Sequence, residues 1–323
     1  MATPQTINIA LLDADIPVPS VLSVRGLYSN IFRELLEAAL IRLAKANLIT
    51  SNPPPKVHFS AYNIVRGEYP SDPSSLSGIV ISGAAGSAYD TDPWISTLHS
   101  WLRHVHANHP HVKLFGSCFG HQVICSALVP PPSSPAAGPA VVTKNPAGWE
   151  LGIHAITLSP AFLRAFPVDV LALPSAPAFA DRRDAKLKLQ LVHNDHVNLP
   201  ADDNSDDNDD NDAAFASIGW TPRCAVQGVY DGDRVLTLQG HFEFDRFVNT
   251  ETVKVFGAKW EEGALREAIR MIEEGEGGKD DAGWAAEMVM AFFMGLGRER
   301  VVLGAGGAMV EGGLLTPPEE VEM

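Results

Sequence analysis

The chain has 323 residues, 46% of them hydrophobic, and a formal net charge of −15 at pH 7. This length accommodates one large domain or two small ones with a full core. The acidic balance and the absence of a basic stripe disfavour nucleic-acid binding, and no apolar stretch approaches the length of a membrane span.

Apolar strand-like segments alternate with helical patterns along the first 130 residues. Strands that alternate with helices predict an open, mostly parallel α/β sheet flanked by helices, with the active site at the carboxyl ends of the strands. The segment 13–26 is predicted to be a loop. Strands are predicted at 6–12, 56–64, 79–82 and 112–115, and helices at 27–46, 93–106 and 119–128.

The second half of the chain carries two strand patterns, two helical patterns and three loop-like segments. The alternation of Leu187, Leu189 and Leu191 indicates a strand over 182–193, with one apolar side. Taken together with the elements of the first 130 residues, these patterns predict a single domain over residues 1–300. The other features are a strand at 235–238, helices at 261–274 and 281–296, loop insertions near 130–140 and 201–213, and a flexible tail over 301–323.

Neither a metal nor a disulfide is expected. The Asp-rich insertion at 201–213 lacks the glycine and the closing glutamate of an EF-hand loop. The chain holds three cysteines, Cys118, Cys125 and Cys224, and its first residues show no signal-peptide pattern. This usage predicts a reducing, cytoplasmic setting.

Residues 114–122, Leu-Phe-Gly-Ser-Cys-Phe-Gly-His-Gln, are the most informative segment. They predict a strand, a tight turn and a helix, with Cys118 at the apex of a nucleophile elbow. The free N–H groups and the dipole of the following helix favour a thiolate there, and Gly116 and Gly120 leave room for the turn. Because a lone buried cysteine is usually a small core residue, this segment alone leaves both interpretations open.

A second segment favours the catalytic interpretation. The predicted strand at 235–238 is followed by Gly240-His241-Phe242-Glu243. Residues two apart in an extended segment lie on the same side, so Glu243 can orient the His241 imidazole. A base and a group that orients it are what a cysteine nucleophile requires.

The elbow and the Gly-His-Phe-Glu segment resemble the two signatures of class I glutamine amidotransferases, although that family usually has proline where Phe242 stands. Residues 79–87 resemble the strand and loop that supply an oxyanion N–H, with Ala84 in place of a second glycine. Residues 148–152 and 193–197 resemble the GMP-synthetase-like branch, and Asp92-Pro93-Trp94-Ile95 resembles plant γ-glutamyl peptidases. The resemblance covers roughly residues 6–260 and implies a flavodoxin-like fold.

The resemblance also implies roles for individual residues. Cys118 is the expected nucleophile, His241 the base and Glu243 the group that orients it. Main-chain N–H groups of Phe119 and of Gly83 or Ala84 are the expected oxyanion donors, and Gly83 is expected to take any positive φ. Three side chains are expected to contact a small γ-glutamyl substrate, Asp195 and Glu150 at its α-amino group and Gln122 elsewhere; a purely structural role is the alternative for each.

Three functions compete. The favoured one is a stand-alone hydrolase of glutamine or a γ-glutamyl peptide that needs no cofactor. The second is a glutaminase subunit that supplies ammonia to a synthase, which would be a separate chain because this one has neither a P-loop nor a Ser-Gly-Gly-x-Asp-Ser loop. The third is a regulatory relative without activity. A DJ-1/PfpI-like cysteine hydrolase shares the elbow and is disfavoured by the downstream Gly-His-x-Glu segment.

Overall fold

The computed structural model describes residues 5–51, 53–130, 141–199, 215–277 and 279–297. Apart from Pro130, the predicted insertions near 130–140 and 201–213 and the predicted tail over 301–323 lie outside the described residues. No helix in the described part is long and apolar enough to cross a membrane.

A seven-stranded sheet forms the centre of the molecule, in the order β2-β1-β3-β4-β12-β11-β9. The pairs from β2 to β12 are parallel, and only the edge formed by β11 and β9 is antiparallel. The predicted open, mostly parallel sheet is therefore confirmed. Its strands are β1 (Thr6–Asp13), β2 (Lys56–Asn63), β3 (Gly78–Ile81), β4 (Lys113–Ser117), β9 (Ala216–Ser217), β11 (Val229–Tyr230) and β12 (Val235–Leu238).

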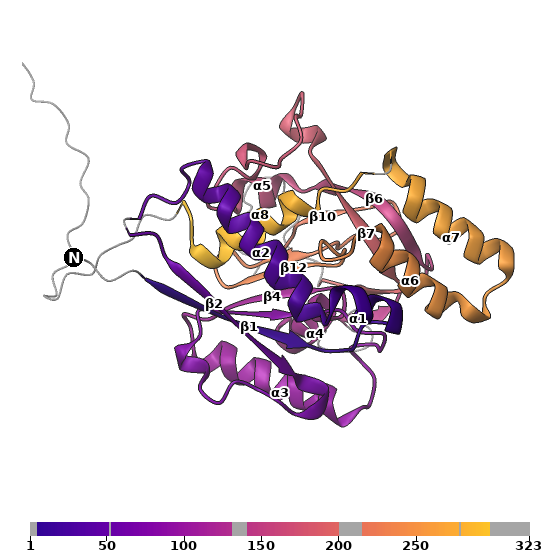
Figure 1. The fold of residues 1–323 in the computed structure, drawn as a ribbon, viewed down its shortest axis with the longest axis horizontal. Coiled ribbons are helices and arrows are strands. Elements are labelled where there is room, and N and C mark those ends of the chain that lie inside the picture. The colour runs from indigo at the N-terminus through magenta and orange to yellow at the C-terminus, as the bar shows by residue number, and fades with distance from the viewer. Residues whose placement is uncertain (1–4, 52, 131–140, 200–214, 278, 298–323) are drawn as a thin grey trace, which may run out of the picture.

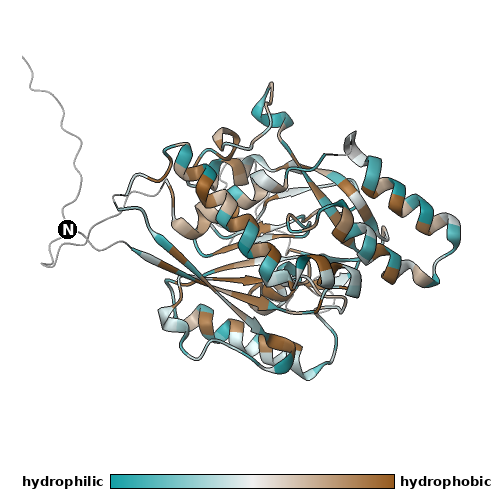
Figure 2. Cartoon of the chain, in the orientation of Figure 1, coloured by the Kyte–Doolittle hydropathy of each residue, from teal (hydrophilic) through white to brown (hydrophobic). Residues whose placement is uncertain are grey.

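Both faces of this sheet are covered by helices. Ile9 and Leu11 of β1 belong to one buried cluster with residues of α2 and α8, whereas Ala10 and Leu12 belong to a second cluster with residues of α3 and α4. Figure 1 shows α3 on the opposite side of the sheet from α2 and α8, and Figure 2 shows how apolar the sheet between them is. The four helices are α2 (Tyr28–Lys45), α3 (Pro93–Asn108), α4 (Phe119–Leu128) and α8 (Ala282–Met294).

Two small antiparallel sheets pack beside the large one. One has the order β10-β6-β7, and the other pairs β5 with β8. The apolar side predicted for β7 is confirmed, because Leu187, Leu189 and Leu191 are fully buried; the strand begins four residues later than predicted because 182–184 form a 3-10 turn. The strands are β5 (Val142–Lys144), β6 (Glu150–Leu158), β7 (Lys186–His193), β8 (Asp195–Val197) and β10 (Gly219–Trp220).

The remaining helices are short or follow the last strand. The predicted loop at 13–26 was wrong in part, because it contains α1, a helix too short to show a helical period; Pro19 at its first turn supplies the favoured φ. The helices are α1 (Pro19–Arg25), α5 (Pro160–Ala165), α6 (Arg246–Phe256) and α7 (Glu262–Glu274), with 3-10 turns at Ile64–Arg66, Pro73–Ser75, Val170–Ala172, Arg182–Asp184, Gly257–Lys259 and Gly275–Gly277.

The glycines of the elbow are required by close backbone packing. A Cβ at Gly116 would lie 2.3 Å from the carbonyl of Gly120, and a Cβ at Gly120 would lie 2.3 Å from the carbonyl oxygen of Ile81. These glycines therefore let the start of α4 lie directly against the ends of β3 and β4.

Gly120→Ala is expected to destabilise the fold by more than about 3 kcal/mol, because the backbone it would strike cannot move aside without displacing α4. Gly263→Ala is the matched control: Gly263 is also the second residue of its helix, and its Cβ would meet nothing within 4 Å. That variant is expected to gain up to about 1 kcal/mol. Urea unfolding of both proteins measures the difference, and equal midpoints would contradict the packing argument.

Candidate active site

Cys118 occupies the turn between β4 and α4, with φ 50° and ψ −104°. Only Asn47 and Cys118 have a positive φ among the described non-glycine residues. Such a conformation costs roughly 1–3 kcal/mol and persists where surrounding contacts fix it. Here the Cys118 N–H donates to Leu238 O at 2.9 Å, and its carbonyl accepts from Gln122 N at 3.0 Å. The strained turn therefore presents the thiol above the end of the sheet, 7% exposed.

His241 is held by two neighbours, Glu243 and Phe244, and Ser117 in turn holds Glu243. Its Nδ1 donates to Glu243 Oε1 at 2.7 Å, and its ring stacks on Phe244 with centroids 3.9 Å apart. Ser117 Oγ donates to both oxygens of Glu243, at 2.8 and 3.1 Å. The imidazole is thus fixed by its edge and by its face, and its buried Nε2 has no hydrogen-bond partner among the described residues.

The charge state of His241 follows from these contacts. Burial alone would lower its pKa, but the Glu243 carboxylate and the negative charge and hydrogen bonding of Cys118 outweigh burial and raise the pKa of His241 to about 10. The Glu243 carboxylate next to the ring therefore favours the imidazolium form of His241. The structure therefore brings Cys118, His241 and Glu243 together in one buried cluster.

The loop after β3 lies against the same cluster. A Cβ at Gly83 would lie 3.0 Å from His241 Cε1 and 3.7 Å from Cys118 Cβ. The expectation that Gly83 takes a positive φ was wrong, since neither Gly83 nor Ala84 has one. Glycine is needed at position 83 because a side chain there would push against the imidazole.

Two main-chain segments adjoin Cys118, the first turn of α4 and the loop after β3. Phe119 is the first residue of α4, so its N–H has no acceptor within the helix. The loop that carries Gly83 and Ala84 is anchored by two bonds, from Ala85 N to Asp15 Oδ2 and from Ala14 N to Ser82 Oγ, both 2.9 Å. The two segments that carry the expected oxyanion donors, one with Phe119 and one with Gly83 and Ala84, therefore lie next to Cys118.

Two of the three expected substrate contacts lie beside this cluster. Gln122 Nε2 donates to Asp195 O at 3.2 Å and to Gln239 Oε1 at 3.0 Å. The Asp195 carboxylate accepts from Ser87 Oγ at 2.5 Å and from Tyr89 OH at 3.0 Å. Asp195 therefore joins β8 to the loop after β3, and its side chain is half-buried.

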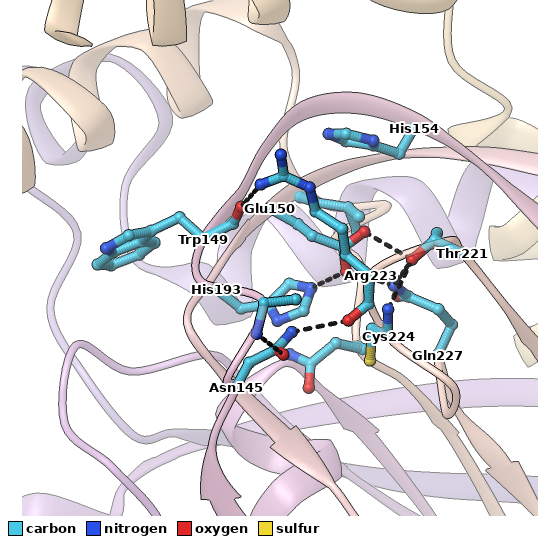
Figure 3. Close-up of polar contacts among 12 residues, drawn as sticks. Asn145, Trp149, Glu150, His154, His193, Thr221, Arg223, Cys224 and Gln227 are labelled. Atoms are coloured by element: carbon cyan, nitrogen blue, oxygen red, sulfur yellow. Dashed lines mark hydrogen bonds and ion pairs between the residues drawn. The ribbon is translucent and has the colours of Figure 1, made fainter.

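Glu150 lies in a separate, closed network (Figure 3). It is 1% exposed, and its oxygens accept from Thr221 Oγ1 at 2.6 Å and from Gln227 Nε2 at 2.8 Å. His193 Nε2 lies 3.1 Å from Glu150 Oε2. Although burial alone would raise the pKa of Glu150, hydrogen bonding and charge from His193 hold it below its usual value.

This network reaches the active site through the main chain. His193 Nδ1 hydrogen-bonds to Asp195 O at 2.9 Å, the carbonyl that Gln122 also contacts. Glu150 thus supports β8 through His193, and the bonds of its carboxylate lie within this network rather than at Cys118, His241 or Glu243. Among the described residues, no group of three or more His, Cys, Asp or Glu side chains is arranged to hold a metal.

Sequence reasoning missed Ser117, Phe244 and Gln239. Gln239 Nε2 donates to Cys118 Sγ at 3.5 Å. The signal for Gln239 was present, because Gln239, His241 and Glu243 are spaced two apart, as residues on one side of an extended segment are. No such pattern singled out Ser117 or Phe244, whose contacts depend on tertiary structure.

Sequence comparison relates the chain to glutamine amidotransferase-like proteins and γ-glutamyl peptidases. It is 27% identical over 254 residues to a glutamine amidotransferase-like protein of Schizosaccharomyces pombe, covering 77% of this chain and 84% of that one. It is 29% identical over 173 residues to a protein of Saccharomyces cerevisiae named as a glutamine amidotransferase, covering 52% and 53%. It is 25% identical over 194 residues to γ-glutamyl peptidase 2 of Arabidopsis thaliana, covering 59% and 64%. No protein-family model matches the chain.

Two of the solved structures that share this fold are named glutamine amidotransferases. One from Thermotoga maritima superposes with a TM-score of 0.51 at 16% identity and covers 89% of this chain and 98% of that one. One from Methylobacillus flagellatus superposes with a TM-score of 0.53 at 17% identity and covers 95% and 100%. The predicted flavodoxin-like fold is confirmed by these structures, and the resemblance to glutamine amidotransferase-like proteins and γ-glutamyl peptidases is confirmed by the relatives.

Proposed function

We propose that the chain hydrolyses the γ-glutamyl amide bond of glutamine or of a γ-glutamyl peptide, through a thioester on Cys118. The observation that carries this proposal is the location of His241. Its Nδ1 is hydrogen-bonded to Glu243, and its imidazole ring lies next to Cys118. A nucleophile, a base and a group that orients the base are the parts that covalent acyl transfer requires.

The proposed reaction has two steps. The Cys118 thiolate attacks the γ-carbonyl carbon, and main-chain N–H groups of Phe119 and of Gly83 or Ala84 stabilise the oxyanion; each such donor contributes roughly 3–4 kcal/mol. The imidazolium of His241 gives its proton to the departing amine. Water, deprotonated by His241, then attacks the thioester, and free glutamate leaves as the thiolate re-forms.

Substrate recognition is proposed for the groups beside Cys118. The Asp195 carboxylate is suited to the α-amino group of a γ-glutamyl substrate, because the hydroxyls of Ser87 and Tyr89 orient it without neutralising its charge. Gln122 would contact the substrate from α4. For Glu150 the buried network favours an indirect role, through His193 and the main chain of Asp195.

A second candidate is the glutaminase subunit of a two-chain amidotransferase. It is favoured by the glutamine amidotransferase names of the solved structures and of the yeast relatives. In that case ammonia would pass to a synthase on another chain. A regulatory relative without activity is less consistent with a complete set of triad side chains.

Turnover by the isolated chain separates these functions. The full chain, without ATP or a partner, is expected to release amine from at least one of glutamine, glutathione or a γ-glutamyl dipeptide. A diazo-ketone analogue of glutamine is expected to label Cys118 before Cys125 and Cys224, whose thiol pKa values burial raises, that of Cys224 to about 12. If no substrate turns over but Cys118 is labelled, the subunit function is favoured; if Cys118 also resists labelling, the hydrolase proposal fails.

A further inference from the structure

A row of side-chain amides leads from β8 to the sulfur of Cys118. Gln122 Nε2 donates to the main-chain carbonyl of Asp195 at 3.2 Å and to Gln239 Oε1 at 3.0 Å. Gln239 Nε2 then donates to Cys118 Sγ at 3.5 Å. Both glutamine side chains are buried, Gln239 completely and Gln122 to within 3%.

The direction of this row is set at its far end. A main-chain carbonyl only accepts hydrogen bonds, so the NH₂ group of Gln122 must point at Asp195 O. The same NH₂ group needs an acceptor on Gln239, which turns the Gln239 oxygen toward Gln122. The Gln239 NH₂ group then points at the sulfur. The orientation of both side-chain amides thus follows from the main-chain carbonyl of Asp195, which can only accept a hydrogen bond.

The main chain holds Gln239 at this distance from the thiol. Gln239 directly follows β12, whose last residue pairs with Ser117 and accepts the Cys118 N–H. Gln239 N also donates to Gln227 O at 2.9 Å. The parallel pairing of β12 with β4 therefore places Gln239 beside Cys118 independently of the His241 contact.

We infer that Gln239, by donating a hydrogen bond to the Cys118 sulfur, stabilises the thiolate of the resting enzyme, and that Gln122 orients Gln239. A buried NH₂ donor gains more from a charged acceptor than from a neutral thiol, and the closed surroundings exclude competing water. The inference rests on the proposed role of Cys118 as nucleophile. It assigns Gln122 a positioning role through Gln239, in addition to any substrate contact.

The test is the pH dependence of Cys118 alkylation by iodoacetamide in the full, substrate-free chain, with Cys118→Ala as the blank. The titratable groups that interact with the sulfur are His241 and Tyr28, and Glu243 is hydrogen-bonded to His241; all three stay in place in Gln239→Met. This variant keeps the size of the side chain and removes the donor. The pH of half-maximal alkylation is expected to rise by about one unit, which corresponds to about a tenfold slower reaction on the acid side.

Gln190→Met is the matched control, because Gln190 is an equally buried amide whose Oε1 accepts from Asn249 Nδ2 at 2.7 Å. It is expected to lose stability and to keep the wild-type alkylation profile. If Gln239→Met does not fold, Gln122→Met takes its place and is expected to shift the profile in the same direction by a smaller amount. An unchanged profile in the folded variant, or an equal shift in Gln190→Met, would overturn the inference. Since iodoacetamide needs no γ-glutamyl group, loss of the proposed function would be detected separately, by turnover.

Discussion

Cys118→Ala is expected to lower γ-glutamyl hydrolysis by a factor on the order of 10⁴ or more, while the chain folds as before. The substitution removes the only atom that forms the thioester and keeps a Cβ, so the strained φ of 50° and its supporting bonds persist. The oxyanion donors and the substrate contacts remain and account for any residual rate. Amine release at saturating substrate, with circular dichroism as the check on folding, measures both parts of the prediction.

Cys125→Ala is the control for this variant. Cys125 lies within α4, the helix that Cys118 precedes. Its side chain is fully buried, and its sulfur lies 3.7 Å from His121 Nδ1. Turnover is expected to stay within a few-fold of wild type, with some loss of stability from the small cavity. Wild-type turnover in Cys118→Ala would remove the basis of the functional proposal, whereas equal losses in both variants would point to damage of α4 rather than of the chemistry.

The sequence predicted the centre of this site because its parts are local. The elbow follows from a strand, two glycines and a helix within nine residues, and the pairing of His241 with Glu243 follows from the alternation of an extended segment. Gly83 was also singled out, but for a positive φ that it does not have. Its requirement comes from the distance to an imidazole that lies more than 150 residues away in the chain, which no local pattern reveals.

The same reason explains what was missed around the site. Ser117 contacts Glu243, and Gln239 contacts Cys118, only because β4 and β12 are neighbours in the sheet. Glu150 matches a segment of the related proteins, but its burial beneath β8 depends on the small antiparallel sheets, most of whose strands are short and lack a clear period.

Phe242 illustrates how a departure from the family pattern is accommodated. Its ring packs against Phe32 of α2 at 5.4 Å and Phe115 of β4 at 5.6 Å between centroids. The segment between His241 and Glu243 is thereby anchored in the core by an aromatic side chain, where the related proteins usually have proline. His241 and Glu243, which flank Phe242, keep their hydrogen bond.

His241→Ala is the second variant with a large expected effect. Hydrolysis is expected to fall by a factor on the order of 10³ or more, because the thiolate loses its counter-ion and the leaving amine its proton donor. Glu243→Gln is expected to be milder, since the imidazole and the oxyanion donors remain and only the orienting charge is lost. His104→Ala, on the exposed side of α3, is the control and is expected to turn over at the wild-type rate. A Glu243→Gln enzyme as active as wild type would mean that another group orients His241; Asp245 is then the next candidate.

His241→Ala is also expected to change how the free energy of unfolding depends on pH. His241 has a pKa of 6.5 in its ordinary state and about 10 in the folded chain, so the folded chain holds this proton more tightly than the unfolded chain does. Its contribution to the free energy of unfolding is therefore complete below about pH 6.5 and is lost as the pH rises through about 10. Urea unfolding at about pH 7 and about pH 9.5 is expected to show a decline in the wild type that is reduced in His241→Ala. An equal decline in both proteins would show that the folded chain does not hold the His241 proton more tightly than the unfolded chain does.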